Sequence, residues 1–307
     1  MKKTNKIVVI GSSNTDMVVR VDHFPQPGET IIGEQFMTAA GGKGANQAVA
    51  VARLGGDVTF VCRLGNDVFG KQSLLQLQAE GMNTQYVKLT PGAASGVALI
   101  PVDKKGENTI IVASGANALL SAEDIREAEN EIATASFVLM QLETPIEALI
   151  CAAELAHKHD VKVVLNPAPF PKEALPDALL RNVDMIIPNE TEAEYMTGQK
   201  VTNESTALSV VNKIHGMGVK EVIITVGKDG AYVSTASDDL HLVSSFPVEA
   251  VDTVAAGDTF CGALCVALSK GYCLLDAVKI GNKAASIAVT RVGAQPSVPT
   301  ANEVFDN

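Results

Sequence analysis

Short apolar segments alternate with helical patterns along most of this chain, and the alternation is most regular from residue 136 onward. The runs SFVLMQLE, VKVVLN and VDMIIPN are typical of buried strands and end at Glu143, Asn166 and Asn189. Strands that are apolar throughout are covered on both faces, as in parallel sheets flanked by helices. The pattern therefore predicts an α/β fold, a doubly wound and mostly parallel sheet with helices on both faces.

Two further stretches depart from this alternation. Residues 17–38 contain short β-type runs broken by prolines and glycines, and the runs 95–102 and 108–113 flank a turn. Such punctuation is typical of hairpins, and two hairpins can pair into a small sheet. We expect an α/β core formed by residues 1–13, 39–93 and 115–307, and a small sheet formed by residues 14–38 and 94–114.

Composition limits the kind of protein and its partners. Apolar residues make up 47% of the 307 residues and charged residues 19%, which is typical of a globular domain with a substantial core. The formal net charge of −11 disfavours a nucleic-acid backbone as partner. It does not exclude an anionic small ligand, since a local site can be positive on an acidic protein.

The cysteines and the apolar runs bear on location. The chain has five cysteines without a CxxC or a zinc spacing, which favours reduced thiols in a reducing compartment. The apolar run that follows Lys2, Lys3 and Lys6 has only four residues, Ile7 to Ile10, too few for a signal peptide. No apolar stretch approaches the roughly 18 residues of a membrane-spanning helix. We therefore expect a cytoplasmic protein with no membrane partner.

The stretch VDTVAAGDTFCGA, residues 251–263, combines small residues with an acid at a helix start. Ala255, Ala256 and Gly257 let backbone N–H groups approach a ligand, and the first N–H groups of a helix favour an anion. Asp258 follows directly. It is either a base that takes a proton from a hydroxyl attacking a phosphoryl group, or a simple helix cap. The stretch alone leaves both interpretations open.

A second glycine-rich stretch, AGGKGANQ, opens a helix at residues 40–47. It is not a phosphate-binding Walker loop, because Gly44 follows Lys43 where that loop needs serine or threonine. Lys43 and Asn46 can hydrogen-bond hydroxyl groups, so the stretch suits a polyhydroxylated ligand. Asn14 and Asp16 follow the first strand, where they either meet a ligand or form a turn.

Two further segments each have two interpretations, and a third predicts the start of a helix. In NETE, Asn189 and Glu192 either form a capping box or lie near magnesium and phosphates. The turn at 227–230 either holds a nucleotide or closes a hairpin. The sequence TPIE predicts a helix with Thr144 at the N-cap and Pro145 at the first helical position.

The two glycine-rich stretches together resemble the two signatures of the ribokinase-like (PfkB-type) sugar kinases, in matching order and separation. The resemblance covers nearly the whole chain, and GSSNTD, PGET, GENTI, MQLE, LNPAP and GAQPSVP extend it. It implies ATP-dependent phosphorylation of D-ribose at its 5-hydroxyl. It also implies that the small sheet is a lid over the active site and the contact of a homodimer.

The resemblance implies roles for particular residues. Asp258 would be the catalytic base, beside the backbone N–H groups of Ala255, Ala256 and Gly257. The implied ribose contacts are Asn14, Asp16, Gly42, Lys43, Gly44, Ala45, Asn46 and Glu143. The implied ATP contacts are Gly257, Asn189 and Glu192 with Mg²⁺, the turn Thr225, Val226, Gly227, Lys228, Asp229 and Gly230, and Asn282, where relatives often carry histidine. The implied K⁺ site consists of Asp252, Val254, Ala288, Arg291, Gly293 and Ser297.

Other functions stay open on the sequence. A related kinase could act on deoxyribose, fructose or adenosine, since the sequence does not reveal the depth of the pocket. A non-catalytic sugar-binding regulator is disfavoured because Asp258 and its glycine are present. A nicotinamide dehydrogenase lacks the expected glycine fingerprint after the first strand. For the cation site, the simpler alternative is an ion pair between Asp252 and Arg291.

Overall fold

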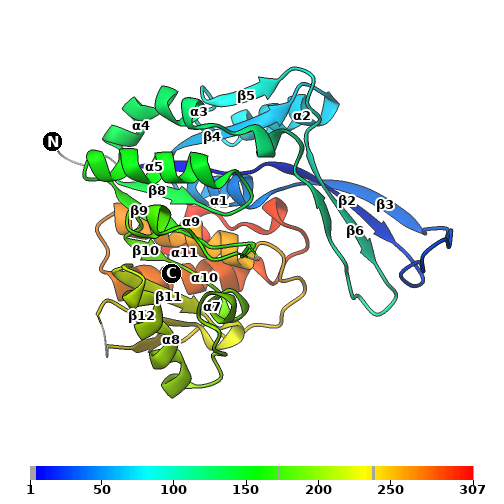
Figure 1. Ribbon diagram of the computed structural model, residues 1–307. Coiled ribbons are helices and arrows are strands. Elements are labelled where there is room, and N and C mark those ends of the chain that lie inside the picture. The colour runs from blue at the N-terminus through cyan, green and yellow to red at the C-terminus, as the bar shows by residue number, and fades with distance from the viewer. Residues whose placement is uncertain (1–4, 172, 237–238, 307) are drawn as a thin grey trace.

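A large sheet runs through the centre of the computed structural model, which describes residues 5–171, 173–236 and 239–306 (Figure 1). Its strands are β1 (Lys6–Ile10), β4 (Asp57–Gly65), β5 (Val87–Thr90), β8 (Phe137–Met140), β9 (Lys162–Leu165), β10 (Met185–Ile186), β11 (Glu221–Thr225), β12 (Ala231–Ser234) and β13 (His241–Val243). They lie in the order β13-β12-β11-β10-β9-β8-β1-β4-β5. The strands from β5 across to β11 pair in parallel, whereas β12 and β13 are antiparallel. The predicted doubly wound, mostly parallel sheet is confirmed.

Helices cover both faces of this sheet. They are α1 (Lys43–Arg53), α2 (Val68–Ala79), α3 (Ala122–Glu127), α4 (Glu129–Thr134), α5 (Ile146–Lys158), α6 (Asp177–Leu180), α7 (Glu190–Thr197), α8 (Glu204–Gly216), α9 (Ala256–Ser269), α10 (Leu274–Ala288) and α11 (Ala301–Phe305). Successive residues of β1 alternate between the two cores: Ile7 and Val9 pack with α1, α9 and α10, while Val8 and Ile10 pack with α3, α5 and α8. This alternation is what a strand buried on both faces requires.

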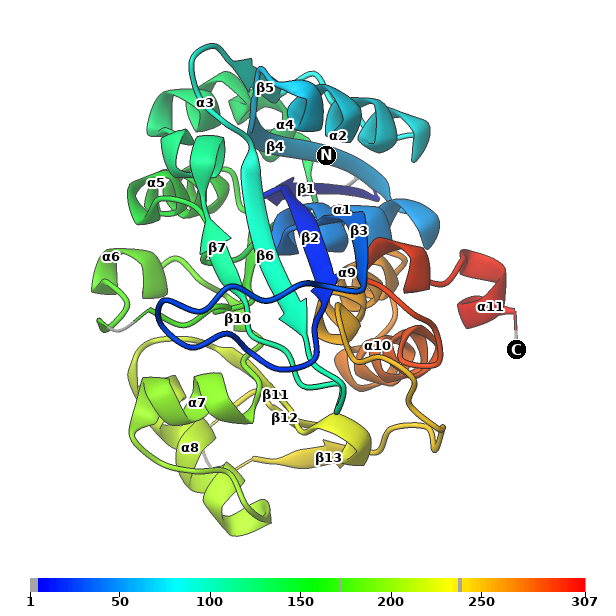
Figure 2. The same cartoon turned by 90° about the vertical axis from the view of Figure 1, so that its right-hand side faces the viewer.

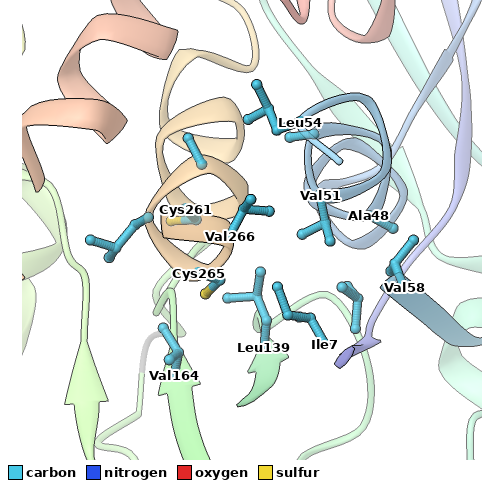
Figure 3. Packing of buried hydrophobic residues seen from close by; sticks show 14 of the residues in the cluster. Ile7, Ala48, Val51, Leu54, Val58, Leu139, Val164, Cys261, Cys265 and Val266 are labelled. Atoms are coloured by element: carbon cyan, nitrogen blue, oxygen red, sulfur yellow. The ribbon is translucent and has the colours of Figure 1, made fainter. Parts of the chain in front are cut away.

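Helices α1 and α9 lie side by side on one face of the sheet (Figure 3). Ala48 and Val51 of α1 and Cys265 and Val266 of α9 are buried in the same cluster. A Cβ atom at Gly262 would lie 2.5 Å from the Cβ of Ala50, so the two helices can approach this closely only with glycine there. The contact joins the two glycine-rich stretches of the sequence.

The small sheet projects from one side of the core (Figure 1), and Figure 2 looks at that side. Its strands are β2 (Asn14–Arg20), β3 (Gln35–Gly41), β6 (Gly96–Val102) and β7 (Ile111–Ala113), in the order β3-β2-β6-β7. Strands β2–β3 and β6–β7 pair antiparallel, and β2 pairs with β6 in parallel, so the expected pairing of two hairpins is confirmed. We call this sheet the lid. Strand β3 continues to Gly41, past the expected boundary at residue 38.

The start of α5 differs from the prediction. The helix begins at Ile146, and Pro145 occupies the N-cap with a non-helical ψ of 134°. The hydroxyl of Thr144 caps nothing and is buried without a hydrogen-bond partner within the described chain. The Thr144 cap was therefore wrong, because Pro145 is not itself helical. Among the described residues, no helix is both long and apolar enough to cross a membrane.

Candidate active site

Several of the expected site residues lie together at the carboxyl edge of the parallel strands, where ligands bind in open α/β sheets. A cavity of about 180 Å³ opens there in front of the first turn of α9. It is lined by Lys43, Asn166, Ala168, Ile187, Asn189, Glu192, Thr225, Thr253, Ala255, Ala256, Gly257, Asp258 and Cys261. A bigger cavity of about 780 Å³ lies beside α6 and α7, but its lining includes none of the expected residues. The convergent polar groups therefore mark the smaller cavity as the site.

Asp258 does not cap its helix. The N-cap of α9 is Ala255, in the left-handed conformation with φ of 58°, and no side chain caps the helix. Asp258 instead accepts hydrogen bonds from Asn46 Nδ2 at 3.0 Å and from Gln47 Nε2 at 3.0 Å. Its carboxylate is thus held by two amides of α1 at the edge of the cavity. The structure therefore excludes the cap interpretation, and the base interpretation stays a prediction.

The first turn of α9 leaves N–H groups for a ligand. Residues 256–258 are the first three of the helix, so their N–H groups have no partner four residues back. That of Ala256 reaches Thr253 O at 3.3 Å. A Cβ atom built at Gly257 would meet nothing within 4 Å, so the glycine faces open space. The space before Gly257 and Asp258 suits an anion.

The start of α1 depends on its glycines. Gly42 is the N-cap with φ of 89°, and a Cβ at Gly44 would lie 2.5 Å from the backbone nitrogen of Ser12. The close approach lets the Ala45 N–H donate to Ser12 O at 2.8 Å. Glu143 completes this helix end, because its Oε2 accepts from the Lys43 N–H at 3.0 Å and also from the Ser12 hydroxyl. Glu143 is thereby fixed beside Lys43.

Charges are concentrated around the Lys43 side chain. Burial by itself lowers the pKa of Lys43, but the carboxylates of Asp258, Glu143 and Glu192 outweigh it and raise the pKa overall. Burial, helped by the charges of Glu143 and Asp258, raises the pKa of Asp16 to about 6. Asp16 therefore lies close to the same group of carboxylates. Asn14, two residues before Asp16 in the chain, is also buried, and its Oδ1 accepts a hydrogen bond from Asn117 Nδ2 at 2.7 Å.

Asn189 and Glu192 form the capping box expected of the NETE segment, and their placement near magnesium and phosphates stays a prediction. The Asn189 N–H donates to Glu192 Oε2 at 2.9 Å, and the Glu192 N–H donates to Asn189 Oδ1 at 2.8 Å, which is a complete capping box. Both residues also line the cavity. Burial raises the pKa of Glu192 despite the Asn189 N–H and Lys43, which lower it.

The expected nucleotide residues form a second group next to the cavity. Within the turn Thr225, Val226, Gly227, Lys228, Asp229 and Gly230, Thr225 lines the cavity and the others do not. The turn also closes the β11–β12 hairpin, with Thr225 opposite Ala231. Asn282 does not reach the cavity, and its Nδ2 donates to Val243 O at 2.9 Å. A Cβ at Gly230 would meet the same Val243 carbonyl at 2.1 Å, so Val243 connects the turn with Asn282.

The expected cation residues gather where two loops meet. Asp252 accepts from the Val254 N–H at 3.0 Å and, through its other oxygen, from the Gly293 N–H at 2.8 Å. The expected alternative of an Asp252–Arg291 ion pair is not formed, because Arg291 pairs with Glu303. The Ala288 carbonyl accepts from the Arg291 N–H at 3.0 Å, and Ser297 hydrogen-bonds to Ala294. The loops are thus tied together through Asp252.

Several site residues were not singled out from the sequence. Gln47, Asn166 and Cys261 contact Asp258 or line the cavity, and Asn117 supports Asn14. Asn166 ends a predicted strand, so the rule that placed Asn14 near a ligand could also have found it. The positions of Gln47 and Cys261 follow from the packing of α1 against α9, which has no sequence signature.

Comparison with known proteins decides the family. Residues 4–301 match the model of the pfkB family carbohydrate kinases. The chain belongs to this family. This pfkB-family chain is 44% identical over 306 residues to a ribokinase of Haemophilus influenzae, covering 100% of this chain and 98% of the relative. It is 45% identical to a ribokinase of Staphylococcus aureus, covering 98% of this chain and 99% of the relative.

A solved structure extends the likeness to three dimensions. The structure of an Arabidopsis thaliana ribokinase complexed with ribose and ATP superposes with a TM-score of 0.92 at 33% identity. The match covers 99% of this pfkB-family chain and 98% of the plant chain. The likeness therefore includes the core and the lid together.

Proposed function

We propose that this chain transfers a phosphoryl group from ATP to the 5-hydroxyl of D-ribose, giving ribose 5-phosphate and ADP. The observation that carries the proposal is the Asp258 carboxylate, which lies at the start of α9 and is held by Asn46 and Gln47 rather than used as a cap. In the reaction Asp258 accepts the proton of the attacking hydroxyl. The α9 N–H groups, including that of Gly257, stabilise charge on the transferring group.

The sugar is recognised by polar groups at the root of the lid. Asn14 and Asp16 begin β2, Lys43 and Asn46 begin α1, and Glu143 follows β8. A site built from such groups rejects ligands that leave them unpaired. Gly42, Gly44 and Ala45 keep the backbone of this helix start close to the ligand. The full-length identity with two ribokinases supports ribose over other acceptors.

ATP occupies the second group of residues, with its phosphates toward the start of α9. The turn at 225–230 and Asn282 flank the nucleotide, and Asn189 and Glu192 lie near its phosphates. Magnesium is commonly bound through one or two carboxylates together with substrate phosphates. Glu192 fits this role, since its carboxylate lines the cavity and the capping box uses only its Oε2. When bound, the ion would neutralise negative charge on the phosphates.

A potassium ion fits the two loops at Asp252. Arg291 is engaged by Glu303, so the Asp252 carboxylate is not neutralised by that side chain. Backbone carbonyls of Val254, Ala288, Arg291 and Gly293, with Ser297, would complete an oxygen-rich site. The ion would add positive charge near the start of α9 and hold the loop that carries Ala255.

The proposed enzyme is a dimer of identical chains joined through their lids. It acts in the cytoplasm and has no nucleic-acid or membrane partner. The acidic net charge supports the absence of a nucleic-acid partner, and the free cysteines support a reducing compartment.

The substrate is tested by ADP release in a coupled assay with ribose, 2-deoxyribose, fructose and adenosine. We expect the highest kcat/KM with ribose. A higher value with adenosine or deoxyribose would reassign the substrate within the family, and no ADP release with any acceptor would favour a sugar-binding regulator.

The base is tested by Asp258→Asn. Loss of a general base typically lowers turnover by about 10²–10⁴-fold, and we expect a loss of this size while ribose binding persists. Binding is measured by calorimetry, so that a variant that has lost its site is recognised. Turnover near the wild-type rate would refute the assignment of Asp258 as base.

A further inference from the structure

Gln47 is a buried amide whose hydrogen-bonding groups are all engaged inside the protein. It is fully buried, and its Nε2 donates to Asp258 Oδ1 at 3.0 Å and to Asn166 Oδ1 at 3.0 Å. Its Oε1 accepts from Gln141 Nε2 at 2.6 Å. Both amide hydrogens and the carbonyl oxygen are thus used.

The orientation of this amide is set by its neighbours. Asn166 donates through Nδ2 to Ile187 O at 2.9 Å, which turns its Oδ1 toward Gln47. A reversed Gln47 amide would place its oxygen against two acceptors, Asn166 Oδ1 and the Asp258 carboxylate. Unpaired buried polar groups of this kind are costly. Gln47 can therefore present only a donor to Asp258.

Asn46 contacts the same carboxylate but differs in one respect. Its Nδ2 donates to Asp258 Oδ2 at 3.0 Å, while its buried Oδ1 has no hydrogen-bond partner among the described residues. That oxygen remains for a ligand hydroxyl, whereas Gln47 has nothing left to offer one. Asn46 thus keeps one acceptor that is unpaired within the described chain, whereas every hydrogen-bonding group of the Gln47 side chain is engaged within the protein.

We propose that Gln47 is a positioning residue for the phosphoryl transfer described above, on which this inference rests. It holds Oδ1 of Asp258 so that the carboxylate keeps one orientation toward the acceptor hydroxyl. The close contact of α1 and α9 at Gly262 keeps Gln47 within reach, since a Cβ there would lie 3.0 Å from Gln47 O. Gln141 and Asn166, at the ends of β8 and β9, connect this arrangement to the sheet.

The test uses two substitutions of similar size, Gln47→Met and Gln47→Glu. We measure the single-turnover rate of phosphoryl transfer with the enzyme in excess over ATP and with saturating sugar, across pH, because product release does not limit that rate. Gln47→Met removes the donor and should lower the rate by about 10–100-fold, with KM for the sugar changed less than about threefold. Gln47→Glu places a second carboxylate beside Asp258 and should move the acidic limb of the pH–rate profile upward by about one pH unit or more.

Val49→Ala is the matched control, because Val49 is fully buried on the same helix and belongs to the apolar core. It should lose stability and keep the wild-type pH profile. The acceptor in this test is the one that the wild type phosphorylates best. If that acceptor is not ribose, the proposed function changes, but the test of Gln47 still applies. A Gln47→Met enzyme with a rate within twofold of wild type, and a crystal structure with the Asp258 carboxylate unmoved, would overturn the proposal.

Discussion

At the scale of single residues, Asp16 connects pH with sugar binding. Its raised pKa of about 6 means that the free protein protonates it in mildly acidic solution. The ionised carboxylate is the better acceptor for sugar hydroxyls. We therefore expect KM for ribose to rise as the pH falls below about 6, and Asp16→Asn to bind ribose weakly at every pH. A KM that rises equally in both proteins would contradict this role.

The same carboxyl affects stability with a definite sign. In the unfolded chain Asp16 ionises around its ordinary value of 3.8, whereas in the folded chain it ionises near 6. Folding therefore disfavours the charged form, and the contribution of Asp16 to the free energy of unfolding falls as the pH rises from about 4 to about 6. Asp16→Asn should raise Tm relative to wild type at pH 8 and change it little at pH 4. Calorimetric melting at the two pH values checks the difference.

A substitution at Gly257 should affect stability and activity differently. A methyl group there would meet no protein atom within 4 Å, and alanine favours a helix over glycine by up to about 1 kcal/mol. Gly257→Ala should therefore keep or raise Tm, yet lower kcat by about 10-fold or more because the methyl group enters the anion site. Gly216→Ala, in an equally open position at the end of α8, is the control and should leave kcat unchanged. An active Gly257→Ala enzyme would place the phosphoryl group elsewhere.

At the scale of elements, Asp252 in the loop before α9 accepts a hydrogen bond from the Gly293 N–H in the loop after α10, and a second from the Val254 N–H in its own loop. If a potassium ion completes this junction, the initial rate at fixed ionic strength should be higher in potassium than in sodium or a bulky organic cation. Asp252→Ala should remove the difference. Equal rates of the wild type in the three salts would mean that Asp252 ties the loops unaided.

The elements of the core could be predicted, and the reasons for the exceptions are physical. The apolar runs that became β1, β8 and β9 needed no tertiary information, because burial on both faces determines their composition. The VDMIIPN run gave a strand of only two residues, Met185–Ile186, since pairing in the sheet decides length. The predicted N-cap of α5 lies one residue too early in the chain. Proline favours the first helical position, but Pro145 has a non-helical ψ of 134° and is itself the N-cap.

The candidate site was predicted less completely. The role of Asp258 stayed open on the sequence because a cap and a base share the same residue type at a helix start. Its partners Asn46 and Gln47 lie more than 200 positions away in the chain, so the contact exists only through the packing of α1 on α9. Side chains that act through such contacts cannot be identified from periodicity.

At the scale of the whole molecule, the lid carries exposed apolar side chains that a folded chain would ordinarily cover. Phe36, Met37, Leu99, Ile111 and Val112 are all exposed. Leu99 pairs with Ile111, and Val112 is the next residue along β7, so Leu99 and Val112 point to opposite faces. We expect a dimer through the lid, and an aspartate at one of these two positions should give monomers in analytical ultracentrifugation. A wild-type monomer, or dimers with both Leu99→Asp and Val112→Asp, would contradict this interface.

The root of the lid is also the proposed sugar site, since β2 begins at Asn14 and β3 ends at Gly41, one residue before the N-cap of α1. If the lid rotates as a rigid body about its root, its far end moves a long way while the residues at the root hardly move. Asn14 and Asp16 would thus keep their geometry through such a swing, whereas the far ends of β2 and β6 would govern how much solvent enters. Substitutions at the root of the lid would then change which sugar is bound. Substitutions at the far ends of β2 and β6 would change how much ATP is lost to hydrolysis by water.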